Sequence, residues 1–125
     1  RAPLGWDMDK GELMMGGSIA EGCLVQVCHA GVNDILSGVD QAIATLPESD
    51  FKPAGAVIIS CTARKWILGV RVKEEVERIF SRLGYSIPLI GLPSFGEIGP
   101  IRRSDGTYTA SMFHNQQYVV LFLGQ

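Results

Sequence analysis

Long runs of one kind of residue are missing from this sequence. No basic run is longer than Arg102–Arg103, and no apolar stretch approaches the roughly 20 residues that a transmembrane helix needs. No secretory signal is recognisable either. We therefore expect neither a nucleic acid partner nor a membrane span. The chain also has no internal repeat and no low-complexity segment, so a globular domain is expected.

Cysteine and histidine are scarce and badly spaced for metal binding. The three cysteines give no disulfide framework, and no C-x-x-C or H-x-x-x-H motif occurs. Cys23 and Cys28 are five residues apart on an expected strand, so they should point to opposite faces, and His29 is six residues from Cys23. We expect no metal site. An odd number of thiols is unremarkable in a reducing compartment, so we expect a cytoplasmic protein.

What is present fits one domain over residues 1–125. Hydrophobic residues make up 46% of the chain, charged residues 19%, and the formal net charge is −2. A chain of 125 residues can bury a core of moderate size. Because the sequence opens on strand-like residues at Arg1 rather than on Met, we expect it to be a piece of a longer protein.

The first half predicts a hairpin, a strand and a helix. Residues 4–9 and 12–17 flank Lys10–Gly11 as the arms of a hairpin. Residues 23–29 are a strong strand candidate. The next segment predicts a helix that ends at Pro47, followed by a polar loop over 48–53. Its apolar positions have helical spacing: Val32, Ile35, Leu36, Val39, Ala42, Ile43 and Leu46.

The second half predicts alternating strands and helices. Residues 54–61 form a short apolar run typical of a strand covered on both faces. Residues 62–69 are expected to connect it to a helix over about 71–83, which is followed by a strand over 87–92 and another over 118–123. This order implies right-handed crossovers and parallel pairing. We expect an α/β fold with one mixed parallel and antiparallel sheet, two helices packed on it, and hairpins at its edges.

The stretch 91–115 carries the most unusual residues. Glu97 lies between Gly96 and Gly99, directly after an expected buried strand. The two glycines allow close backbone approach, so Glu97 and nearby N–H groups could face a ligand. The alternative is a tight turn in which Glu97 is merely solvated. A polar tip follows at 102–106.

Two chain segments that leave strands should lie at one end of the sheet, where ligands bind in open α/β folds. One follows Cys61 and the other follows Leu92, which would bring Cys61, Arg64 and Glu97 to one rim. Arg64 could bind a carboxylate and Glu97 an ammonium group, which together suit a zwitterion such as an amino acid. The alternative is that Arg64 and Glu97 pair with each other or with solvent.

Two other chemistries remain open. Cys61 with His114 could act as nucleophile and base, although a lone Cys on an apolar strand is more often a small buried hydrophobe. His29 and His114 are the imidazoles available to a non-covalent haem iron. The alternative for His114 is to bond backbone at a strand start, with Asn115 capping the same turn.

Four short motifs, in order, resemble the C-terminal module of the FIST family. They are Ser60-Cys61-Thr62-Ala63-Arg64, Leu68-Gly69, the segment Gly91 to Gly99 with its Gly-Glu-Ile-Gly turn, and Phe113-His114-Asn115-Gln116. The resemblance covers nearly the whole chain. Only the tip over 100–107 departs from the family pattern.

The resemblance implies an intracellular, non-catalytic sensory or signalling domain that binds a small ligand, with amino acids proposed. It also implies an N-terminal FIST module in the full-length protein and a signalling partner protein. Some relatives resemble haem-binding gas sensors, and others are coupled to F-box proteins of ubiquitin-ligase assemblies. The motif positions carried over as ligand-binding are Cys61, Arg64, Gly96, Glu97, Gly99, His114 and Asn115.

Overall fold

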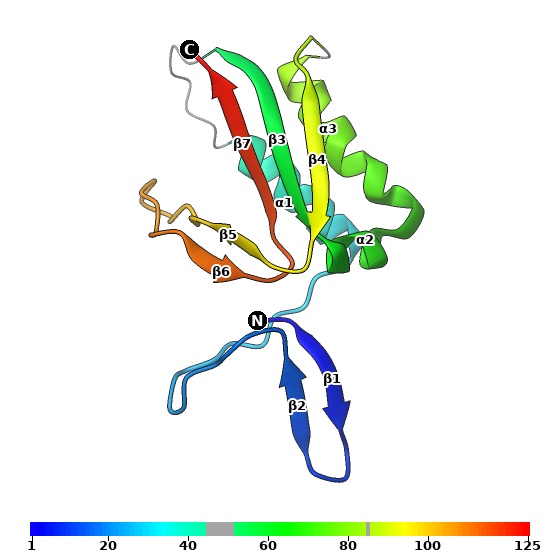
Figure 1. Ribbon diagram of the computed structural model, residues 1–125, viewed down its shortest axis with the longest axis vertical. Coiled ribbons are helices and arrows are strands. Elements are labelled where there is room, and N and C mark those ends of the chain that lie inside the picture. The colour runs from blue at the N-terminus through cyan, green and yellow to red at the C-terminus, as the bar shows by residue number, and fades with distance from the viewer. Residues whose placement is uncertain (45–51, 85) are drawn as a thin grey trace.

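A three-stranded sheet forms the centre of the computed structural model, which describes residues 1–44, 52–84 and 86–125 (Figure 1). Its strands are β3 (Pro53–Cys61), β4 (Leu89–Ser94) and β7 (Tyr118–Gly124), in the order β4-β3-β7. β3 runs parallel to β4 and antiparallel to β7. The prediction of a mixed sheet is therefore confirmed, with β4 two residues later than expected.

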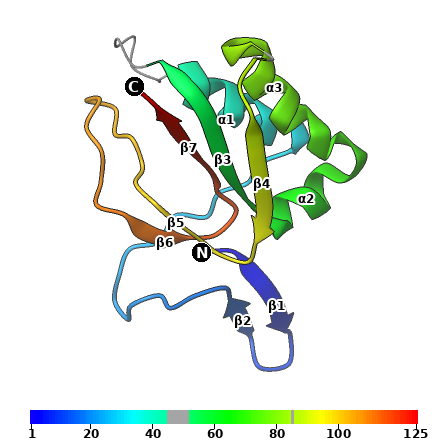
Figure 2. The same ribbon diagram turned by 45° about the horizontal axis from the view of Figure 1, so that its top comes forward.

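Two long helices cover one face of this sheet, as Figure 2 shows. They are α1 (Val32–Ala44) and α3 (Lys73–Leu83), and both follow the predicted apolar spacing. Their apolar stripes meet the central strand in one cluster of buried side chains, Val39, Ile43, Ile58 and Ile79. The expected end of α1 at Pro47 and most of the loop after it lie outside the described residues. Within the described residues, no helix has the length and apolarity that crossing a membrane would require.

The connection expected over residues 62–69 is present, and it is itself helical, which the sequence pattern did not predict. α2 (Thr62–Leu68) starts directly at the end of β3, and a 3₁₀ helix, η1 (Gly69–Val72), links it to α3. Arg64 and Leu68 are four residues apart and both are buried, so a helical turn brings both toward the core. Gly69 adopts a φ of +54° at the end of α2, which favours glycine there.

Two hairpins extend from the central body. β1 (Pro3–Asp7) and β2 (Glu12–Met15) pair antiparallel, which confirms the first predicted hairpin. β5 (Glu97–Gly99) and β6 (Met112–His114) form the second. The expected polar tip is also present, since the Gly106 N–H donates to the Arg103 carbonyl at 3.0 Å.

The strand predicted over residues 23–29 is wrong. The segment is exposed throughout and pairs with no strand in the part of the chain that the structure describes. Strand propensity reflects packing and pairing with neighbours rather than a backbone preference alone, so an alternating pattern without a paired neighbour forms no ladder.

Candidate functional site

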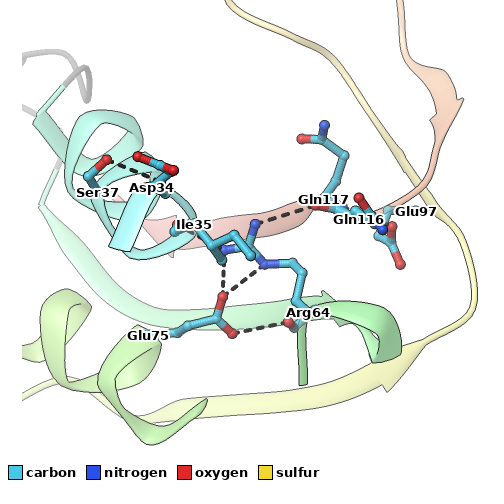
Figure 3. Close-up of polar contacts among 9 residues, drawn as sticks. Asp34, Ile35, Ser37, Arg64, Glu75, Glu97, Gln116 and Gln117 are labelled. Carbon is cyan, nitrogen blue, oxygen red and sulfur yellow. Dashed lines mark hydrogen bonds and ion pairs between the residues drawn. The ribbon is translucent and has the colours of Figure 1, made fainter. Parts of the chain in front are cut away.

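Arg64 and Glu97 both lie at the end of the central sheet where β3 and β4 finish, as the sequence predicted (Figure 3). They do not pair with each other. Each is buried against a different partner, so the alternative of a solvated Glu97 is also overturned.

Arg64, on α2, is held by Glu75 of α3. Its Nε and Nη2 donate to Glu75 Oε1 at 2.8 and 2.5 Å. Nη1 donates to the Gln116 carbonyl and Nη2 to the Ile35 carbonyl, each at 3.4 Å. The guanidinium also lies 5.4 Å from the centre of the Tyr118 ring, within cation–π range. Arg64 thus ties both long helices to the start of β7.

Glu75 is the residue that sequence reasoning missed. Its side chain is 1% exposed, and its second oxygen, Oε2, accepts from Ser60 Oγ at 3.3 Å. A signal was present in the sequence, because Glu75 stands three residues after Val72 and four before Ile79. That spacing puts a carboxylate on the apolar stripe of α3.

Glu97 is also 1% exposed and is bound by its own turn. Its Oε1 accepts from Ser94 Oγ at 2.5 Å, and its Oε2 accepts from the Gln117 N–H at 3.2 Å. A buried carboxylate with hydrogen-bond donors on both oxygens is a stable arrangement. The hydrogen bond from Gln117 to Glu97 therefore fixes the approach to β7.

The turn before β7 brings these motifs together. Gln116 has a φ of +60°, which is uncommon for a residue other than glycine. Arg64 binds the carbonyl of Gln116, and Glu97 binds the N–H of Gln117. The Cys61 N–H donates to the Gln117 carbonyl at 3.1 Å. Two motif segments that are far apart in sequence, 60–64 and 91–99, thus hold the turn at the end of a third, 113–116.

His114 and Asn115 have structural partners as well. His114 Nε2 lies 3.1 Å from the Gly99 carbonyl, across the β5–β6 pair. Asn115 Oδ1 accepts from the Ala2 N–H at 3.2 Å, which ties the first strand to this end of the molecule.

The glycines allow close packing. A Cβ at Gly96 would overlap the Phe113 ring, and one at Gly99 would lie 3.4 Å from Val119. All seven residues that the family resemblance indicated therefore have contacts at this end of the fold.

A hollow of about 380 Å³ lies beside the Arg64–Glu75 pair, between α3 and the outer edge of β4. Its polar side chains are Ser60, Lys65, Glu75 and Tyr118. Apolar groups complete the wall: Ile58, Cys61, Val72, Val76, Leu89, Ile90, Leu92 and Pro93.

Within the described residues, four of the predicted site residues are divided among three hollows. Cys61 lines the 380 Å³ hollow, Arg64 lines another of about 250 Å³, and Gly99 and His114 line a third of about 300 Å³. Ligand binding by all seven at once therefore has no single cavity to support it, and their roles as ligand contacts stay a prediction.

Tyr118 links this hollow to the ion pair. Its hydroxyl is buried and has no hydrogen-bond partner among the described residues. Burial raises the pKa of Tyr118, the charge of Glu75 raises it further, and Arg64 opposes the shift. The phenol is therefore neutral and free to donate.

The described residues offer few suitable ligands for a metal ion or a haem. Within residues 1–44, 52–84 and 86–125, no group of three His, Cys, Asp or Glu side chains could hold a metal ion. His114 engages Nε2 with a carbonyl, and His29 lies in the exposed segment before α1. A histidine whose Nε2 is engaged by a carbonyl and a histidine in an exposed segment are both poor candidates for an axial haem ligand.

The fold and the buried polar turn define a small α/β domain built around motif residues at one end of its sheet. The family model described as FIST C domain matches residues 1–100, so this chain belongs to the FIST C domain family. Domains of this family are sensory domains of signal transduction. The His114–Asn115 motif lies beyond the matched residues. No curated protein and no solved structure matches the chain.

Proposed function

We propose that this domain is a non-catalytic sensor that binds a small zwitterion with an apolar side chain, such as an apolar amino acid, in the 380 Å³ hollow. One observation carries the proposal. The buried carboxylate of Glu75 lines an otherwise largely apolar cavity together with the buried hydroxyl of Tyr118, which has no hydrogen-bond partner among the described residues. Pockets for small ligands are mostly apolar with a few convergent polar groups.

The polar groups suit the two ends of a zwitterion. Glu75 Oε2 accepts one hydrogen bond, from Ser60, and a carboxylate oxygen can accept another, from an ammonium group. Lys65 on the same wall supplies a positive charge for a carboxylate, and the Tyr118 hydroxyl supplies one more donor. The apolar residues of the wall then receive the side chain of the ligand.

Of the seven motif residues, Cys61 contributes to the wall directly. Arg64 acts through Glu75, which it neutralises and orients. Glu97 holds the turn before β7, and so positions Tyr118 at the first residue of that strand. His114 contacts Gly99, and Asn115 contacts Ala2.

Calorimetric titration with leucine, valine and phenylalanine tests the proposal, with their deaminated analogues as matched ligands. Tyr118→Phe removes only a hydroxyl that has no hydrogen-bond partner among the described residues, so it should fold normally and weaken binding roughly five- to tenfold. Lys65→Ala should weaken binding similarly, whereas Lys73→Ala, on an exposed lysine, should not. Equal affinity for amino acids and deaminated analogues, or no binding by the wild type, would refute the proposal.

The biological setting follows from the family as part of this proposal. The domain would act in the cytoplasm beside an N-terminal FIST module and report ligand binding to a signalling protein. Support for this setting is the family match alone.

A second candidate is a protein-interaction module without a small ligand. It is favoured by the sheet face opposite the helices, where Ile90, Leu92, Leu121 and Leu123 are more than half exposed. Large apolar patches often mark interaction sites. If an amino acid binds saturably and Tyr118→Phe weakens that binding, the sensor is favoured over the protein-interaction module.

A further inference from the structure

The outer edge of β7 is open in the part of the chain that the structure describes. β7 pairs with β3 on its inner side, where the Cys61 N–H donates to the Gln117 carbonyl. Backbone N–H and carbonyl groups alternate in direction along an antiparallel ladder. Those of Val119 and Leu121 therefore point toward β3, and those of Tyr118, Val120 and Phe122 point outward. Three N–H groups and three carbonyls therefore point away from the sheet.

The other edge of the sheet is protected in a way that β7 is not. The Ala56 N–H donates to the Pro88 carbonyl, so the alternation puts the backbone of Pro93 on the outer side of β4. A proline has no N–H to donate and blunts a sheet edge against further pairing. β7 contains no proline, so its edge is the better acceptor of an added strand.

A slot runs along this acceptor edge. A hollow of about 300 Å³ is lined by Tyr118, Val120 and Phe122 of β7. Ala42 and Ile43 of α1 form one wall, and the hairpin that follows β5 forms the other. The slot has β7 as its floor and walls on both sides, which is the shape that an extended strand fills.

The same chain carries a segment that matches the slot. Cys23–His29 has seven residues, as β7 has, and strands of equal length pair over their full extent. The segment alternates, contains no Asp, Glu, Lys or Arg, and is exposed, with Val27 at 96%. Cys23, Val25 and Val27 would face the apolar side of the slot at α1. Leu24, Gln26 and Cys28 would face the hairpin, whose lining is mixed and includes Ile101 and Arg102.

We propose that the edge of β7 accepts the Cys23–His29 segment of a second copy of this chain. In its own copy the segment lies beside the β1–β2 hairpin, with which it shares a hollow of about 710 Å³. Within the described residues, each copy therefore holds one unpaired extended segment and one unpaired sheet edge. If each copy adds its Cys23–His29 segment to the β7 edge of the other, both segments and both edges become paired. The result is a two-fold dimer with two identical contacts.

Sedimentation equilibrium of the full chain gives the first test. The wild type should show a reversible monomer–dimer equilibrium, and Val25→Asp should weaken it at least tenfold, because the charge would enter the apolar side of the slot. Val70→Asp is the matched control, since Val70 is an exposed valine outside the slot, and it should dimerise as the wild type does. A wild type that stays monomeric at all concentrations overturns the proposal.

Paramagnetic broadening identifies the edge and the source of the strand. An unlabelled copy carries Cys23→Ser and a nitroxide on Cys28, and it is mixed with a ¹⁵N-labelled copy carrying Cys23→Ser and Cys28→Ser. The amides of Tyr118, Val120 and Phe122 in the labelled copy should broaden. A nitroxide at Glu77→Cys on the exposed side of α3, with both serine substitutions, should leave them sharp. Broadening seen only when nitroxide and ¹⁵N are in the same chain would assign the strand to its own copy and overturn the exchange.

Discussion

Breaking the ion pair between Arg64 and Glu75 should be the most destabilising charge change at this end of the molecule. Arg64→Met leaves the Glu75 carboxylate, which is 1% exposed, with Ser60 Oγ, at 3.3 Å, as its one remaining hydrogen-bond donor among the described residues. Removal of one partner from a buried pair typically costs about 3–5 kcal/mol of the free energy of unfolding. A domain has roughly 5–15 kcal/mol in total, so this one substitution would remove a large share.

Urea unfolding of Arg64→Met, Glu75→Leu and the double variant measures the effect as a double-mutant cycle. The double variant should recover much of the loss, because a hydrophobic replacement of both partners leaves no buried charge. The control is Arg71→Ala, which breaks a hydrogen bond to Asn33 and a pair with Glu74 whose side chains are 41% and 27% exposed, and it should cost far less than Arg64→Met. A cost for Arg64→Met no larger than this control would refute the reasoning.

Three further predictions rest on other parts of the fold. Gly38→Ala lies inside α1 with open space around the added Cβ, so it should raise the free energy of unfolding by roughly 0.5–1 kcal/mol. Gly124→Ala should lower the free energy of unfolding, because its Cβ would overlap the Lys52 carbonyl. Urea unfolding of both variants measures these changes. Tyr118, with its raised pKa, should keep its proton well above the ordinary value of 10.0 in an ultraviolet titration. The unfolded chain releases that proton first, so stability should fall as pH rises past 10.0, and Tyr118→Phe should remove this contribution. Gln116→Gly should be neutral or slightly stabilising in thermal unfolding, and Gln116→Val destabilising, because Gln116 has a φ of +60°.

Much of the fold could be predicted because its signals are local. The helical spacing of Leu36, Val39 and Ile43 predicted the face of α1 that packs on the sheet. The apolar run that became β3 predicted a strand covered by neighbours, and Lys10–Gly11 predicted the first hairpin. Each of these patterns is satisfied by neighbours within the described chain.

Two elements could not be predicted for the same physical reason. Whether Cys23–His29 becomes a strand depends on a partner edge, and whether Thr62–Leu68 becomes a helix depends on two side chains finding the core. Pairing and burial are properties of the folded structure, so propensity alone decided neither.

The candidate site was predicted in position but not in its contacts. Arg64 and Glu97 do reach the same end of the sheet, because the carboxyl ends of the parallel strands β3 and β4 lie together. Their partners, Glu75 and the Gln116–Gln117 turn, come from elements whose distance in space no local pattern gives. Arg64 and Glu97, which the sequence suggested as ligand-binding groups, are each bound by other groups of the protein itself.

Variants of the Arg64–Glu75 pair can therefore distinguish a structural role of Glu75 from a binding role. Since buried ion pairs can often be replaced by hydrophobic residues without loss of stability, stability alone does not explain why Glu75 lines the 380 Å³ hollow. If Glu75 binds an ammonium group, the Arg64→Met and Glu75→Leu double variant should be folded and yet bind no amino acid. If the pair is only structural, the double variant should bind as the wild type does. Calorimetry on this single folded protein thus tests the proposed site without the ambiguity of an unfolded variant.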